Sequence, residues 1–153
     1  MITIYCALYA EAQYLIQYFE LKKDAKVTHF QMFSNEKKDI RVVITGVGKI
    51  TMVVAIAELS ALYPPKAEDI IVNYGSCAVK NCAVGSIFMC NKIVEELTAR
   101  TFYPDMLYQH PFAEACLHTV EKEKLENLAD DCIYDMEAAA FYQGAAFYYG
   151  PHQ

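Results

Sequence analysis

The stretch Asp69-Ile70-Ile71-Val72-Asn73-Tyr74-Gly75-Ser76 runs from an apolar segment directly into a glycine turn. The apolar run is short enough for a buried strand of a parallel sheet, and open α/β sheets bind their ligands at the carboxyl ends of such strands. Gly75 lets the backbone approach a ligand closely, and Ser76 offers a hydroxyl and an N–H to an anion or a water. An ordinary strand-to-loop turn explains this segment alone equally well.

On both sides of this stretch the chain alternates between strand-like and helix-like segments. Strands are predicted over residues 2–8, 26–33, 40–44, 69–74, 86–90 and 132–134. Helices are predicted over residues 9–20, 50–62, 111–128 and 136–149, with an irregular aromatic segment over 98–112. Because no linker or internal repeat interrupts the alternation, it predicts a single α/β domain over residues 1–153.

The composition is that of a packed globular protein. Hydrophobic residues make up 55% of the 153 residues and charged residues 21%, whereas disordered chains lack the apolar groups that offset ordering entropy. The net charge of -6 has the wrong sign for attraction to a phosphate backbone, so nucleic acid is not an expected partner. No apolar run approaches the ~20 residues that span a bilayer, and the N-terminus lacks a basic leader. We therefore expect no membrane partner and a cytoplasmic protein.

Six cysteines and four histidines are spread along the chain. No two cysteines form a CxxC pair and most lie in apolar runs, so buried free thiols are expected. The histidines show no i, i+4 pairing, so neither a metal site nor a cofactor is predicted. They are His29, His110, His118 and His152.

The segment Gly46-Val47-Gly48 lies between a predicted strand and a predicted helix. It does not complete a dinucleotide fingerprint, because Thr51 stands at the third glycine of GxGxxG. A phosphate-binding GxxxxGK[ST] loop also fails, because Val43 and Ile50 stand where Gly and Ser or Thr are needed. A tight turn that needs glycine dihedrals is the better interpretation.

Carboxylates follow two of the predicted strands. Glu11 is the one charged residue between Tyr9 and Tyr14, and Asp135-Met136-Glu137 leads into an almost wholly apolar helix. Carboxylates near a helix N-terminus complement the helix macrodipole, so capping explains each of them taken alone. The alternative is that they face a ligand cleft.

Five motifs taken in order strengthen that alternative. They are Ala7-Leu8-x-x-Glu11, Thr45-Gly46-Val47-Gly48-Lys49, Asn73 to Ala78, Val84-Gly85-Ser86-Ile87 and Asp135-Met136-Glu137-Ala138-Ala139. The collinear set resembles the nucleoside phosphorylase superfamily, which includes the methylthioadenosine/S-adenosylhomocysteine nucleosidases, over residues 1 to about 95 and 132–149. The resemblance implies a three-layer α/β fold with a central mixed sheet flanked by helices, shortened in the middle and incomplete at the C-terminus.

The resemblance also implies a chemistry: cleavage of the N-glycosidic bond of a nucleoside through a transition state with oxocarbenium character. Glu11 would be the catalytic glutamate that activates a water. Met136 would pack beneath the sugar, and Glu137 would accept hydrogen bonds from the ribose hydroxyls. The remaining substrate-binding positions would be Ser76, Gly75 and Gly46.

Departures from the family pattern refine this expectation. Asn73 stands at the strand end that carries arginine in bacterial purine phosphorylases, which favours hydrolysis over phosphorolysis. The family's catalytic aspartate follows the Met-Glu helix, and this chain ends at Gln153 before it, so weak or absent activity is expected. A nucleoside phosphorylase, with phosphate as a second ligand, and a non-catalytic nucleoside-binding or assembly relative stay open as alternatives. The apolar last helix predicts self-association, most simply as a homodimer.

Overall fold

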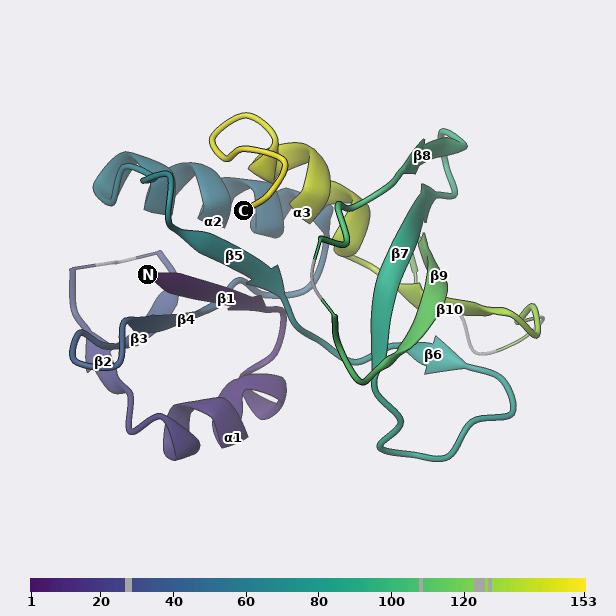
Figure 1. Cartoon of the computed structure of the whole chain (residues 1–153), viewed down its shortest axis with the longest axis horizontal. Helices are drawn as coiled ribbons and strands as arrows, with labels where there is room; N and C mark the ends of the chain where they lie inside the picture. The colour runs from purple at the N-terminus through teal and green to yellow at the C-terminus, as the bar shows by residue number, and fades with distance from the viewer. Residues whose placement is uncertain (27–28, 108, 123–125, 127) are drawn as a thin grey trace.

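The computed structural model describes residues 1–26, 29–107, 109–122, 126 and 128–153. Within these residues the strands form two mixed five-stranded sheets, flanked by helices (Figure 1). The first sheet has the order β2-β3-β4-β1-β5, with β1 (Ile2–Cys6), β2 (Lys22–Asp24), β3 (Gln31–Asn35), β4 (Ile40–Ile44) and β5 (Ile70–Asn73). The second has the order β6-β10-β9-β7-β8, with β6 (Ala78–Val79), β7 (Phe88–Glu95), β8 (Arg100–Phe102), β9 (Ala113–Thr119) and β10 (Cys132–Asp135).

Two helices cover opposite faces of the first sheet. β1 runs parallel to β4 on one side and to β5 on the other, and its side chains alternate between the faces. Tyr5 belongs to the cluster beneath α2 (Lys49–Leu62), whereas its neighbour Cys6 belongs to the cluster against α1 (Tyr9–Tyr18). Figure 1 shows the resulting layers, helix on sheet on helix. The predicted α/β fold is confirmed, with its strands divided between two sheets.

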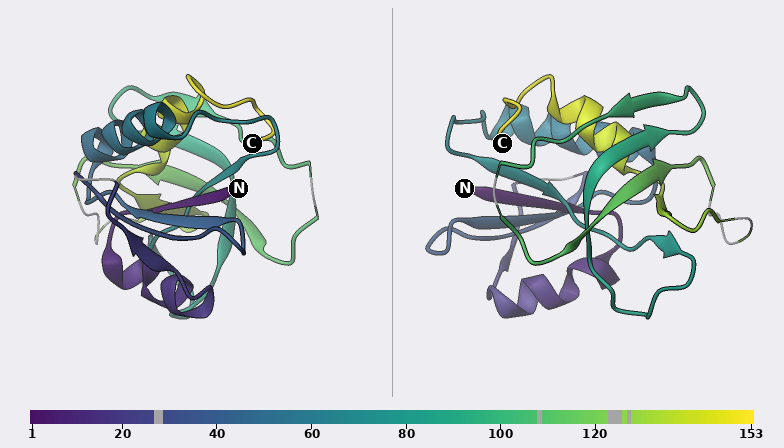
Figure 2. Two further views of the ribbon diagram at one scale, coloured as in Figure 1. Left: turned by 90° about the vertical axis from the view of Figure 1, so that its left-hand side faces the viewer. Right: turned by 45° about the vertical axis from the view of Figure 1, so that its right-hand side comes forward.

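The third helix, α3 (Ala138–Ala145), covers the second sheet and packs beside α2. The views of Figure 1 and Figure 2 agree on this pairing of α2 with α3. A Cβ on Gly144 of α3 would lie 3.3 Å from Ile56 Cδ1 of α2. Glycine at this position therefore allows the two helices to approach closely. α2 packs on the first sheet and α3 packs on the second. The contact between these helices therefore joins the two halves of the molecule, each of which is built around one sheet.

A charged contact joins the same two halves at the start of α2. The Lys49 ammonium forms ion pairs with Glu95, at the end of β7, and with Glu121, which follows β9. Glu95 also accepts hydrogen bonds from the N–H and the hydroxyl of Thr98. These contacts hold the pKa of Glu95 at about 2, below the ordinary 4.5, with the Lys49 hydrogen bond as the largest cause.

The predicted helix over residues 111–128 is wrong. Residues Ala113–Thr119 form β9, a central strand between parallel partners β7 and β10. Leu117 is buried on one face, and the residues on either side of it project from the other, which is a period of two. Sheet pairing on both sides overrides the weak local preference that favoured a helix. Residues 123–125 and 127 of the predicted helix lie outside the described part of the chain.

Smaller differences concern strand positions and cysteines. Of the strand predicted over 26–33, residues 31–33 belong to β3 and residues 27–28 lie outside the described residues, while β2 precedes the predicted range. The segment predicted to be irregular contains β8. All six cysteines are free, as predicted, but Cys6 is the one that is fully buried, and Cys82 is exposed. In the described part of the chain, no helix has both the length and the apolar character to cross a bilayer.

Candidate functional site

The carboxyl ends of three parallel strands meet at one edge of the first sheet. β1 leads into the first turn of α1, which carries Glu11, while β4 leads into Gly46 and Gly48, and β5 leads into Gly75 and Ser76. The Gly46 N–H donates to the Ala7 carbonyl at 3.1 Å, which ties the loop after β4 to the loop after β1. This edge is where open parallel sheets place ligand sites.

Both oxygens of the Glu11 carboxylate are held by specific donors. Oε1 accepts hydrogen bonds from the Ser76 N–H at 2.8 Å and from the Ser76 hydroxyl at 2.6 Å. Oε2 accepts the Leu8 N–H at 2.9 Å, where Leu8 is the N-cap of α1. The capping interpretation of Glu11 is therefore correct for one oxygen, and the other oxygen is bound to a loop 65 residues away.

Gly75 lies directly against the Glu11 carboxylate. A Cβ at position 75 would lie 3.4 Å from Glu11 Oε1 and 3.7 Å from the carboxylate carbon. A Cβ at this position would therefore be in van der Waals contact with the carboxylate. Gly75 and Ser76 are both exposed, so their contact with Glu11 lies at the molecular surface and not in the core.

Asp135 is the residue that caps α3. Its Oδ2 accepts the Glu137 N–H at 3.1 Å and the Ala138 N–H at 2.6 Å, and its Oδ1 accepts the Thr119 hydroxyl at 2.7 Å. Thr119 Oγ1 in turn accepts the Ala139 N–H at 2.9 Å. Asp135 therefore satisfies the first turn of α3, which leaves the Glu137 side chain available for another partner.

Glu137 reaches across to the first half of the molecule. Its Oε1 accepts the Gly48 N–H at 2.6 Å, and Gly48 is the N-cap of α2. The carboxylate lies at the positive end of the α2 macrodipole, which stabilises it there. Gly48 has φ of +108°, a conformation that residues with a Cβ rarely adopt. Met136 is half-buried beside Glu137.

Burial raises the pKa values of Glu137 and Asp135, the two carboxylates at the start of α3. Burial raises the pKa of Glu137 above its ordinary value, and the nearby negative charges of Asp135 and Glu11 raise it further. Burial also raises the pKa of Asp135, against its hydrogen bond from Thr119. The negative charge of Glu11 is thus the weakest of the causes that act on the pKa of Glu137.

The predicted residues fall into two contacting groups along this edge. Glu11 lies with Gly75 and Ser76, and Glu137 lies with the loop of Gly46 and Gly48. Sequence reasoning missed Gly48 and Thr119 as partners of the acidic residues. Glycine dihedrals at the turn were the available signal for Gly48. Thr119 gave none, because it lay inside the segment predicted to be helical.

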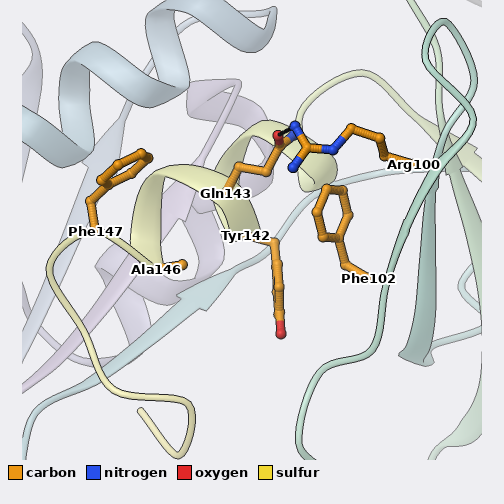
Figure 3. Close-up of a pocket in the computed structure, with 6 residues that line it drawn as sticks. All are labelled: Arg100, Phe102, Tyr142, Gln143, Ala146 and Phe147. Carbon is orange, nitrogen blue, oxygen red and sulfur yellow. Dashed lines mark hydrogen bonds between the residues drawn. The ribbon is translucent and has the colours of Figure 1, made fainter.

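A separate cavity lies between β8 and the end of α3 (Figure 3). It has a volume of about 450 Å³ and shares no residue with the predicted site. Arg100 at its rim donates a hydrogen bond to Gln143 Oε1 at 3.0 Å, and Phe102 packs against Tyr142 with ring centroids 5.4 Å apart. Its other lining residues are Ala146 and Phe147.

Among the described residues, one group of three side chains has the types and spacing of metal ligands. It consists of Cys116, His118 and Cys132, and it lies on β9 and β10, apart from Glu11 and Glu137. The expectation of no metal site was drawn from the absence of helical i, i+4 pairs. The i, i+2 spacing of Cys116 and His118 on a strand is a different pattern, which places both side chains on one face of the sheet.

Comparison with solved structures finds this fold in methylthioadenosine/S-adenosylhomocysteine nucleosidases. The S. pneumoniae nucleosidase, solved with the transition-state inhibitor MT-ImmA, is 19% identical, with a TM-score of 0.73 over 95% of this chain and 79% of its own. The Colwellia psychrerythraea nucleosidase, solved with adenine, is 20% identical, with a TM-score of 0.73 over 95% and 76% of the two chains. The Helicobacter pylori nucleosidase is 11% identical, with a TM-score of 0.75 over 95% and 78%.

No family model and no curated protein matches the chain by sequence. The structural likeness nevertheless covers nearly the whole chain, and it includes both halves of the molecule. The resemblance predicted from the five motifs is thus confirmed for the fold.

Proposed function

We propose that this protein is a nucleosidase-like protein of purine nucleoside metabolism, which binds a nucleoside and hydrolyses its N-glycosidic bond slowly. The observation that carries the proposal is the placement of two carboxylates at one sheet edge. Glu11 is held by the loop after β5, and Glu137 is held by the loop after β4. The fold shared with the nucleosidases supports the same assignment.

Glu11 is the general base of the proposed reaction. A carboxylate offers about four acceptor positions, and three of those on Glu11 are taken by Leu8 and Ser76. Both positions on Oε1 are occupied, so Oε2 is the oxygen that accepts a hydrogen bond from the attacking water. The three hydrogen bonds fix the direction of that remaining position, which is what a positioned base needs.

Glu137 and Met136 hold the sugar. The Gly48 N–H fixes one carboxylate oxygen of Glu137, so the group is oriented before a ligand binds. A carboxylate that accepts hydrogen bonds from two ribose hydroxyls makes charge-assisted contacts, which are stronger than neutral ones. Met136, half-buried at the start of α3, supplies an apolar surface for the ribose ring.

The arginines support hydrolysis over phosphorolysis. A bound phosphate dianion is usually held by arginine, and the chain has two arginines. Arg41 lies over the Tyr63 ring, 3.8 Å from its centroid, and Arg100 is bonded to Gln143 beside the separate cavity. Asn73, not arginine, ends β5. Water is therefore the proposed nucleophile.

The proposal extends to assembly and location. We propose a single domain that works as a homodimer in the cytoplasm. Free thiols at all six cysteines suit a reducing compartment. The outward side of α2 exposes 80% of Ile50 and 49% of Val54, which is apolar area that a second copy would cover.

The test is base release from methylthioadenosine, adenosine and inosine, each with and without phosphate. The proposal predicts slow release of free base at a rate that phosphate does not change. Release that requires phosphate would assign a phosphorylase instead. Measurable nucleoside binding without any release would support the non-catalytic alternative, and neither binding nor release would contradict the proposal.

A further inference from the structure

The outer face of the second sheet gathers three sulfur and nitrogen ligands. β9 and β10 run parallel, with Cys116 opposite Cys132. Leu117 and Ile133 point to the other face, into the core beneath α3. Since side chains alternate along a strand, Cys116, His118 and Cys132 project together from the face away from the core.

The three ligand atoms are already close. The two thiol sulfurs and one ring nitrogen of His118 all lie within 4.8 Å of one another. Around a tetrahedral zinc ion with Zn–S of about 2.3 Å and Zn–N of about 2.0 Å, neighbouring ligand atoms are about 3.5–3.8 Å apart. Binding all three to one ion therefore requires the ligand atoms to move closer by at most about 1 Å.

The donor set selects the kind of ion. Two thiols and an imidazole suit zinc and softer metals, whereas calcium and magnesium require oxygen ligands. All three residues are half-buried, so water competes less for the ligand atoms than at an open surface. The parallel pairing of β9 with β10 sets the register that places Cys116 opposite Cys132.

A carboxylate lies behind the histidine. Glu96 Oε1 is 3.4 Å from His118 Nδ1, and Nδ1 is buried and makes no hydrogen bond within the described residues. Metal-binding histidines commonly donate their second ring N–H to a carboxylate, which fixes the tautomer and orients the ring. When the ion binds, Nδ1 would donate to Glu96 and Nε2 would bind the metal.

We propose that Cys116, His118 and Cys132 bind one Zn²⁺ ion per chain, with water in the fourth coordination position. The two thiolates balance the charge of the ion. The site is independent of the proposed nucleosidase chemistry, because its ligands come from the opposite face of the sheet from α3. A bound ion would cross-link β9 and β10, and β10 is the strand that leads into Glu137.

Cobalt substitution tests the site on the full chain. The reduced protein is stripped with a chelator and titrated with Co²⁺, whose thiolate charge-transfer absorption reports Cys ligands. We expect saturation at one Co²⁺ per chain and loss of the absorption when Zn²⁺ is added. Cys132→Ser and His118→Ala should weaken Zn²⁺ binding by at least about 100-fold, since changes to groups behind the ligands already cost 10–100-fold. Cys82→Ser, an exposed cysteine outside the group, is the matched control.

A second measurement needs no variant. Zn²⁺ should protect Cys116 and Cys132 of the wild-type protein from alkylation, while Cys82 stays reactive, as read by mass spectrometry. The proposal is overturned if reduced wild-type protein gives no thiolate absorption with Co²⁺, if Cys132→Ser binds as tightly as wild type, or if Zn²⁺ protects neither cysteine. A Cys116–Cys132 disulfide that re-forms in preference to metal binding would also overturn it.

Discussion

Glu11 uses one carboxylate oxygen to hold Ser76 and the other to cap its own helix. The two roles are compatible because Leu8 and Ser76 approach from different sides of the carboxylate. Sequence reasoning identified Glu11 and Ser76 from strand-end positions, and the structure brings them into contact. It did not identify the Glu137 partner, because Gly48 is 89 residues away and no local pattern links the two.

Replacing Glu11 tests its role as the base. Glu11→Gln keeps an acceptor oxygen for Ser76, places an amide NH2 where the Leu8 N–H was accepted, and removes the charge that accepts a proton. We expect base release to fall about 100-fold or more, the size of a general-base contribution, with little change in nucleoside affinity. Glu36→Gln, an exposed glutamate in the turn between β3 and β4, is the control. Equal rates for wild type and Glu11→Gln would remove Glu11 from the mechanism.

At the scale of elements, β1, β4, α2 and β5 were predicted from sequence because each carries a strong local pattern. β9 was not, because its neighbours in the sheet decide its conformation, and β7 and β10 are distant along the chain. The wrongly predicted helix affects the contacts expected within the second sheet. A helix over 111–128 would have separated Cys116 from Cys132 and Thr119 from Asp135.

The inward face of β9 gives a direct test of the strand. Leu117→Ala should lower the free energy of unfolding by about 3 kcal/mol, because Leu117 is buried in the core of the second sheet. Glu114 on the same strand is exposed, so Glu114→Ala should change the free energy of unfolding by less than about 0.5 kcal/mol. Urea unfolding measures both. Similar losses for the two variants would argue against the alternation of β9.

The ion pair between α2 and β7 gives the stability a pH dependence. Because the pKa of Glu95 is lowered from 4.5 to about 2, its contribution is present above pH 4.5 and is lost as the pH falls towards 2. Glu95→Gln should therefore cost about 2 kcal/mol at neutral pH, and this difference from wild type should shrink across that window. Urea unfolding at a series of pH values measures it. A difference that is constant with pH would exclude the carboxylate charge as its source.

At the scale of the whole molecule, exposed apolar side chains on α2 and just after α3 predict self-association. Ile50 is 80% exposed, and Phe147, after α3, is 84% exposed. We expect a dimer in light scattering at micromolar concentration and a monomer for Ile50→Glu, because a buried unpaired charge is unfavourable in an interface. Tyr14→Glu, an exposed site on α1, should remain dimeric. A wild-type monomer at that concentration would contradict the proposed assembly.

The central claim is that the edge holding Glu11 and Glu137 binds the ribose of a purine nucleoside. Its most direct test is calorimetric binding of adenosine and of 2′,3′-dideoxyadenosine to wild type and Glu137→Gln, since glutamine still accepts the Gly48 N–H. We predict that wild type binds adenosine more tightly than the dideoxy compound. Glu137→Gln should weaken adenosine binding by about 10-fold or more and leave dideoxyadenosine binding unchanged. No adenosine binding, or an equal effect of Glu137→Gln on both ligands, would contradict the claim.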